Sequence, residues 1–328
     1  MVEEEPSSLA SIAKSQKIPP KEFEKQYKDH ISGFNDWNQK EHADIWMLFP
    51  ENIGPYLSID EVALTNGELY TVITNKEAHG KKKALVGMIE GTRSKDVSAI
   101  VNKIPIEKRR KVQEITLDMA ESMACIVRGS FPNATLVTDR FHVQQLVSEA
   151  VQEIRIHYRK EAIRQENASI KEAKEKKKRY IPYVHENGDT KKQLLARSRY
   201  ILFKPESKWN DRQNERAKIL FSEYPKIKSA YNLSMYFRSC YEQSDSIEEA
   251  KMKFGKWYKK VEEKNIDSFV VVSESIRLHE QEILNYFINR STNAGAESFN
   301  AKLKGFRSVV RGVRDKKFHL FRVAKLYG

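Results

Sequence analysis

Cysteine is scarce in this sequence, with only Cys125 and Cys240 among 328 residues. Two cysteines exclude a cysteine-rich zinc module and indicate a reducing compartment. Long apolar runs are also missing, since none approaches the ~18 residues that cross a membrane. Residues 1–6 are acidic, which excludes a signal peptide. With 40% hydrophobic and 31% charged residues, we expect a globular, cytoplasmic protein of one or two domains.

Acidic residues are nearly absent from the C-terminal end, although the net charge of the whole chain is only +13. Residues 298–328 hold nine lysines and arginines against one acidic residue, and residues 151–200 hold 14 against seven. Charge concentrated in this way is typical of a surface that binds a polyanion. A solvated helix face explains residues 151–200 equally well, whereas the C-terminal segment favours nucleic acid.

The apolar pattern predicts a mixed α/β domain in the first half of the chain. Residues 1–50 are expected to form a helical lead-in that is partly disordered. Strands are then predicted over 56–64, 68–74, 83–89, 114–117 and 134–138, with helices over 94–111 and 121–131. Three antiparallel strands followed by alternating helices and parallel strands is the order of a ribonuclease H-like domain.

Strand patterns largely stop after Asp139, and helical patterns take over. We therefore expect a catalytic domain over residues 51–142 and 287–328, built as a mixed sheet flanked by helices. Residues 143–286 are expected to form a large all-α insertion before the last helix of that domain.

Three acids stand out against this pattern. Asp60 lies in the first strand, Asp118 ends the fourth, and Glu297 opens the last helix. The first and fourth strands are neighbours in the expected fold, so the two aspartates would lie side by side. Burying a carboxylate is costly unless a partner or a metal compensates it. A solvated acid at a strand end, or a first-turn acid favoured by the helix dipole, explains each residue taken alone.

The last helix has two adjacent stripes. The predicted buried stripe is Ala296, Phe299, Leu303 and Phe306. Beside it lie Glu297, facing the sheet edge, and Asn300 and Lys304, which are expected to reach for phosphate.

Six short segments together resemble one protein family. They are Ser58-Ile59-Asp60-Glu61, Thr116-Leu117-Asp118-Met119, Phe131-Pro132-Asn133-Ala134, Asp139-Arg140-Phe141-His142-Val143, Ile283-Leu284-Asn285-Tyr286-Phe287 and Ala296-Glu297-Ser298-Phe299-Asn300-Ala301-Lys302-Leu303-Lys304. In this order they resemble the ISL-three family of bacterial insertion-sequence transposases, which are DDE enzymes with a ribonuclease H-like core. The resemblance implies that Asp60, Asp118 and Glu297 are the catalytic, metal-binding acids.

A second aspartate also follows a strand. Asp139-Arg140-Phe141-His142 lies 21 residues after Asp118 and matches a Cys/Asp-x-x-His motif of related transposases. Strand order favours Asp118 as the catalytic residue, so we assign Asp139 and His142 a supporting role together with Asn300. His142 is expected to be a structural histidine rather than a metal ligand.

The resemblance implies metal-dependent cleavage and strand transfer of DNA, with two Mg²⁺ or Mn²⁺ ions. Partners would be the element ends and target DNA in the bacterial nucleoid, bound by a homodimer or higher synaptic oligomer. The residues expected to neutralise phosphates are Lys302, Lys304, Arg307, Arg311 and Arg314. The alternatives are a structure-selective nuclease of the same fold and an inactive, transposase-derived DNA-binding protein.

The sequence departs from this family before Asp60. Members usually carry a zinc segment and a helix-turn-helix there, whereas residues 1–50 here contain no cysteine and have nine acidic residues against six basic ones. We expect a separate DNA-recognition protein to read the element ends.

Overall fold

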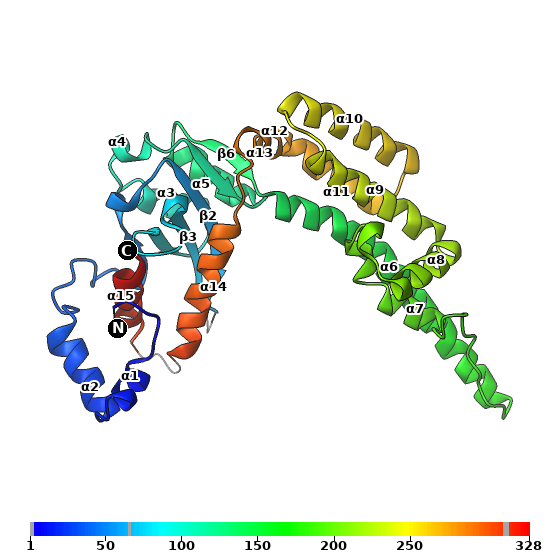
Figure 1. The fold of residues 1–328 in the computed structure, drawn as a ribbon, viewed down its shortest axis with the longest axis horizontal. Coiled ribbons are helices and arrows are strands. Elements are labelled where there is room, and N and C mark those ends of the chain that lie inside the picture. Colours follow the sequence, from blue (N-terminus) through cyan, green and yellow to red (C-terminus); the bar gives the residue numbers. More distant parts are fainter. Residues whose placement is uncertain (1–2, 65–66, 311–314) are drawn as a thin grey trace. The chain divides into compact units, whose positions relative to one another are not determined.

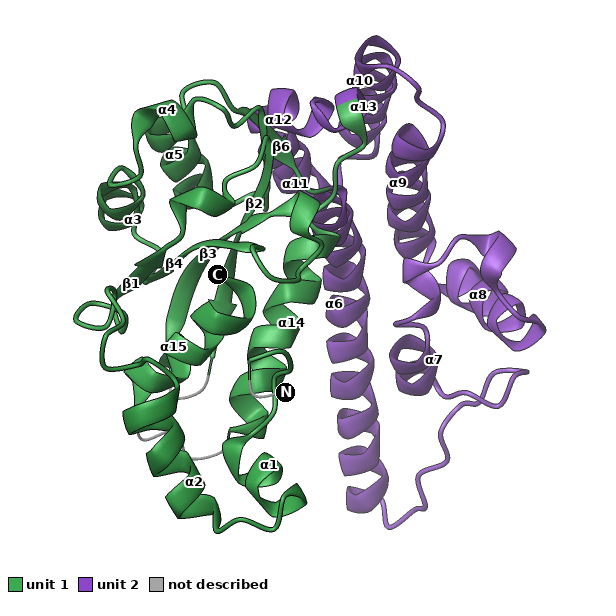
Figure 2. Cartoon of the chain, turned by 60° about the vertical axis from the view of Figure 1, so that its left-hand side comes forward, with its two compact units in different colours: residues 1–139, 289–328 green, residues 140–288 purple. Residues whose placement is uncertain are grey.

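The computed structural model describes residues 3–64, 67–310 and 315–328. They divide into two compact units, shown in Figure 2. Unit 1 comprises residues 1–139 and 289–328, and unit 2 comprises residues 140–288.

Unit 1 is built on a six-stranded mixed sheet with the strand order β1-β4-β3-β2-β5-β6. The strands are β1 (Trp46–Leu48), β2 (Tyr56–Ala63), β3 (Leu69–Asn75), β4 (Leu85–Glu90), β5 (Glu114–Leu117) and β6 (Thr135–Thr138). β2, β3 and β4 pair antiparallel, while β5 runs parallel to both β2 and β6. The predicted strand order, including the pairing of the first and fourth predicted strands, is confirmed.

Apolar layers cover both faces of this sheet. Leu57 and Ile59 of β2 contribute to a core with α3 (Ser94–Val101) and α5 (Glu121–Ser130). The alternate residue Val62 contributes to a second core with α14 (Ala294–Val309) and α15 (Lys316–Tyr327). The predicted stripe of Ala296, Phe299, Leu303 and Phe306 is buried, as expected. The chain thus returns after unit 2 to place α14 over the sheet.

The N-terminal segment differs from the expected helical lead-in. It contains α1 (Leu9–Ser15), α2 (Pro20–Gln26) and the π-helical η1 (Tyr27–Ile31), but it also supplies the edge strand β1. Met47 of β1 pairs with Met88 of β4. Phe34 packs on Phe318 and Phe321 of α15, at ring distances of 5.2 and 5.4 Å. Residues before β2 therefore extend the sheet and its core.

Unit 2 is helical. Its helices are α6 (Arg140–Glu175), α7 (Lys191–Arg197), α8 (Asp211–Glu223), α9 (Pro225–Glu242), α10 (Ile247–Lys264), α11 (Asp267–Leu278) and α12 (Glu280–Leu284) (Figure 1). The short helix α13 (Tyr286–Asn289) leads back into unit 1, which also contains α4 (Ile106–Arg109). Trp257 is fully buried against Phe237, and its Nε1 donates to the Leu233 carbonyl at 2.9 Å. The Trp209 Nε1 donates to Ile201. Both tryptophans therefore have structural contacts within unit 2.

A buried histidine makes the stability of unit 1 depend on pH. Burial lowers the pKa of His319 to about 3 from 6.5, and the positive charges of Arg307 and Arg322 add to the effect. Unfolding therefore takes up a proton between these pH values, so the free energy of unfolding falls as the pH drops below 6.5. The loss approaches about 1.4 kcal/mol per pH unit.

We expect His319→Phe to remove this pH-dependent loss of stability between pH 6.5 and 5, as measured by urea unfolding, because no proton is then taken up at this position. His30→Phe changes an exposed histidine of the same unit and should leave the dependence intact. An unchanged pH dependence in His319→Phe would assign the effect to another group.

Candidate active site

Three aspartates lie at the same level of three neighbouring strands in unit 1. Ser58 of β2 pairs with Thr116 of β5, and each is followed two residues later by an aspartate, Asp60 or Asp118. Leu117 of β5 pairs with Thr138 of β6, so Asp139 follows in register with Asp118. Paired positions of adjacent strands share a face of the sheet. The sheet therefore gathers three carboxylates at one edge.

The segment 289–300 is held on this part of the sheet by side-chain hydrogen bonds. The Asn289 Nδ2 donates to the buried Glu114 at 2.9 Å, and the Thr116 hydroxyl donates to the Asn293 Oδ1 at 3.3 Å. The Asn300 Nδ2 donates to the Asp60 Oδ2 at 2.8 Å. The amide of Asn300 was expected to reach for phosphate, and in the structure it contacts a candidate catalytic carboxylate instead. Glu297 lies on the stretch that these bonds fix.

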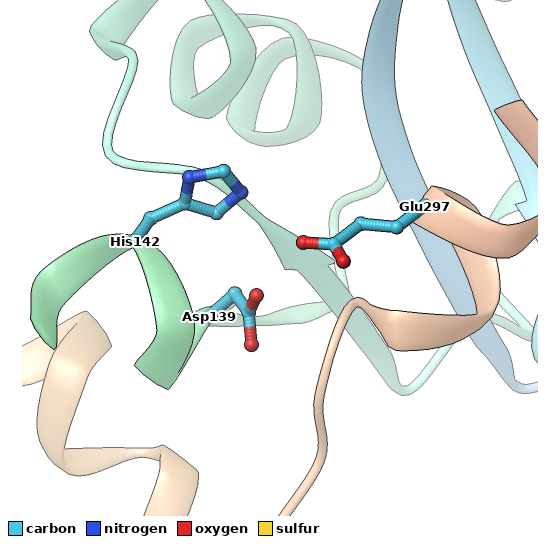
Figure 3. A group of neighbouring side chains, drawn as sticks. All are labelled: Asp139, His142 and Glu297. Carbon is cyan, nitrogen blue, oxygen red and sulfur yellow. The ribbon is translucent and has the colours of Figure 1, made fainter. Parts of the chain in front are cut away.

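The side chains of Glu297, Asp139 and His142 lie close together (Figure 3). One potential ligand atom from each of the three lies within 4.8 Å of the others. Asp139 is buried and directly follows β6, and His142 comes three residues later in the first turn of α6. Both were expected only to support the site. Across the parts of the chain that the structure describes, this is the group arranged closely enough to hold a metal ion.

Asp60 and Asp118 lie in the same acidic environment. Burial raises the pKa of Glu61, and the negative charges of Asp118 and Asp60 raise it further. The Asp60 Oδ1 accepts a hydrogen bond from the Glu61 amide, and the Asp118 Oδ1 accepts one from the Ala120 amide, both at 2.8 Å. Mutual repulsion of this kind is relieved by a hard divalent cation, which prefers carboxylate oxygens.

The five predicted phosphate-binding residues have different environments. Lys302 and Lys304 are exposed on α14, and the Lys302 Nζ donates to the Gly80 carbonyl at 2.8 Å. Arg307 is buried, and its Nη2 lies 3.1 Å from both carboxylate oxygens of Glu68. Arg307 is thus paired within unit 1, and its contact with phosphate stays a prediction. Arg311 and Arg314 lie outside the described residues.

Comparison with protein families identifies the chain. The model of the ISL-three DDE family, described as "Transposase", matches residues 57–323. The chain belongs to this transposase family. The matched range includes every acid of the sheet edge and Glu297. No curated protein and no solved structure matches it.

Membership of this family indicates the general activity of the protein and its substrate. Transposases act on DNA, and the DDE enzymes generally use divalent metal ions. No helix within the described ranges is long and apolar enough to cross a membrane. Divalent metal ions prefer carboxylate oxygens, which the acids at the sheet edge carry.

Substitution of Arg307 tests whether it is structural. We expect Arg307→Ala to lower the free energy of unfolding by about 3 kcal/mol, because Glu68 loses its buried partner. The matched change Lys304→Ala, on the exposed side of α14, should alter stability by less than about 0.5 kcal/mol. Denaturant unfolding measures both. A fully stable Arg307→Ala protein that binds DNA more weakly would restore the original assignment to phosphate.

Proposed function

We propose that this transposase has a ribonuclease H-like catalytic unit that cuts DNA at the element ends and joins them to target DNA. The observation that carries the proposal is the alignment of Asp60, Asp118 and Asp139 on neighbouring strands, with α14 bringing Glu297 to the same sheet. The strand order supports it, since three antiparallel strands precede the parallel ones.

The residues of the sheet edge fit two divalent cations. Asp60, Asp118 and Glu297 would hold Mg²⁺ or Mn²⁺, with Asp139 and His142 beside them. Two features favour a cation here: burial and, after it, the negative charges of Asp118 and Asp60 raise the pKa of Glu61, and the buried Oδ1 of Asn300 has no hydrogen-bond partner. Such ions activate the attacking oxygen and stabilise the leaving oxygen in phosphoryl transfer.

The protein's own side chains position these groups. Asn300 holds the Asp60 carboxylate by a hydrogen bond of 2.8 Å, which sets its orientation before any ligand binds. Lys302 and Lys304 lie exposed on the helix that carries Glu297, where they would neutralise backbone phosphates. Arg311 and Arg314 remain proposed phosphate contacts from the adjoining segment.

The reaction needs no covalent protein–DNA intermediate. Water attacks a phosphorus atom at the element end, and the P–O bond that breaks leaves a 3′-hydroxyl. That hydroxyl then attacks a target phosphate, displacing the target's own 3′-oxygen as the new bond forms. Joining two ends requires two copies of this site, so we propose a dimer or higher synaptic oligomer.

A nuclease of the same fold would cut DNA but not join it, and an inactive DNA-binding relative would do neither. The retained carboxylate set favours an active enzyme. Incubation with a labelled element end, Mg²⁺ and a target plasmid separates these functions, because it scores cleavage and joining independently.

We expect Asp60→Asn, Asp118→Asn and Glu297→Gln each to abolish cleavage in this assay while leaving DNA binding intact, because the carboxylates hold the cations and other residues bind DNA. Glu107→Gln, an exposed acid of the same unit, is the matched control and should cut normally.

Asp139→Asn decides which aspartate is the second ligand. The proposal predicts partial activity for this variant, because Asp139 supports the site. If Asp118→Asn cuts normally while Asp139→Asn is inactive and binds Mn²⁺ more weakly in calorimetry, Asp139 is the ligand and Asp118 is not.

A further inference from the structure

The connection between β3 and β4 is strongly basic. Residues 76–83 contain lysines at positions 76, 81, 82 and 83 and a single acid, Glu77. It begins with the 3-10 turn η4 (Lys76–Ala78), and Lys81, Lys82 and Lys83 are all exposed. None of these residues belongs to the carboxylate site or to the positive segments at residues 151–200 and 298–328.

A hydrogen bond fastens this connection to the helix of the candidate active site. The Lys302 Nζ donates to the Gly80 carbonyl at 2.8 Å. Gly80 has a φ of +65°, and a Cβ added there would come within 3.0 Å of that same Nζ. Lys302 lies five residues after Glu297 on α14, which is about 7.5 Å along the helix axis and about 140° around it. Lys81, Lys82, Lys83 and Lys302 therefore form one exposed basic surface, on the helix that carries Glu297 but on a different side of it.

A shallow cleft of about 460 Å³ opens at the start of the same connection. It is lined by Tyr56, Lys76, Glu77, His79, Asn289 and Ser291. Hydroxyl, ammonium, imidazole and amide groups that can donate hydrogen bonds thus surround it, against a single carboxylate. All six residues belong to unit 1.

Lys76 is the most constrained group of this cleft. Its Nζ is buried without a hydrogen-bond partner, and it lies 3.7 Å from the buried Glu114 Oε1, which also has none. Burial lowers the pKa of Lys76, and the carboxylates of Glu114 and Asp139 partly oppose this. Lys76 thus pairs with Glu114 beneath the cleft and adds positive charge there without facing solvent.

We propose that the surface formed by Lys81, Lys82, Lys83 and Lys302 binds the phosphate backbone of DNA near the phosphate that is cut. This inference rests on the proposed function of the carboxylate site. Lysine ammonium groups are point charges that contact phosphates and carry little sequence information. The surface therefore strengthens binding to all sequences equally and aligns the strand with Glu297.

Salt dependence of binding tests the proposal. The triple variant Lys81→Ala, Lys82→Ala and Lys83→Ala should lower the slope of log affinity against log salt by about 2 to 3, since each lost phosphate contact removes about 0.9. The probe is a fluorescein-labelled duplex of arbitrary sequence, followed by anisotropy in KCl. The control triple Lys14→Ala, Lys17→Ala and Lys21→Ala removes three exposed lysines of the same unit and should keep the slope.

Wild-type protein provides a second readout that does not depend on folding of a variant. Lysine acetylation with and without the duplex, mapped by mass spectrometry, should show protection at residues 81–83 and Lys302 but not at Lys14 or Lys17. An unchanged slope in the first triple, or equal labelling with and without DNA, overturns the proposal. Cleavage of an element end by wild-type protein tests the catalytic proposal separately, because these binding measurements need no turnover.

Discussion

The hydrogen bonds between segment 289–300 and the sheet are the interaction on which the rest of the candidate site depends. Glu297 lies 179 residues after Asp118, with all of unit 2 between them. Asn289, Asn293 and Asn300 each bond to a residue of β2 or β5, while Phe299 and Leu303 bury the other side of the helix. Apolar packing stabilises the helix, and the polar bonds fix where Glu297 lies along the sheet.

This arrangement concentrates negative charge at one edge of the sheet. Burial raises the pKa of Glu61, the negative charges of Asp118 and Asp60 raise it further, and Asp139 directly follows the next strand. Apolar cores cover both faces of the sheet, and this cluster lies where the strands end. The basic turn between β3 and β4 and Lys302 place positive charge nearby, which suits a polyanionic substrate.

Much of the fold follows from local patterns in the sequence. Alternating apolar residues predict β2 and β5, and the spacing of Phe299, Leu303 and Phe306 predicts the buried face of α14. The sequence does not predict β1, because three residues are too few to show the hydrophobic pattern of a strand. Residues 269–272 are apolar and largely β-branched, a composition that also suits a strand, yet they are part of α11.

Contacts between distant residues could not be predicted. Arg307 pairs with Glu68, and Asn300 with Asp60, across 239 and 240 residues. A sequence pattern indicates that such side chains are polar but not which partner they meet. The same limit applies to Asp118 and Asp139, because both directly follow a strand. Strand order favours Asp118, whereas the structure places Glu297 within reach of Asp139.

A crystal structure of the protein grown with Mn²⁺, measured at a wavelength where manganese scatters anomalously, tests whether this edge of the sheet binds metal ions. We expect anomalous density bounded by Asp60, by Asp118 or Asp139, and by Glu297. Manganese bound elsewhere, with these carboxylates making no contact to it, would contradict a metal-dependent site at this edge of the sheet.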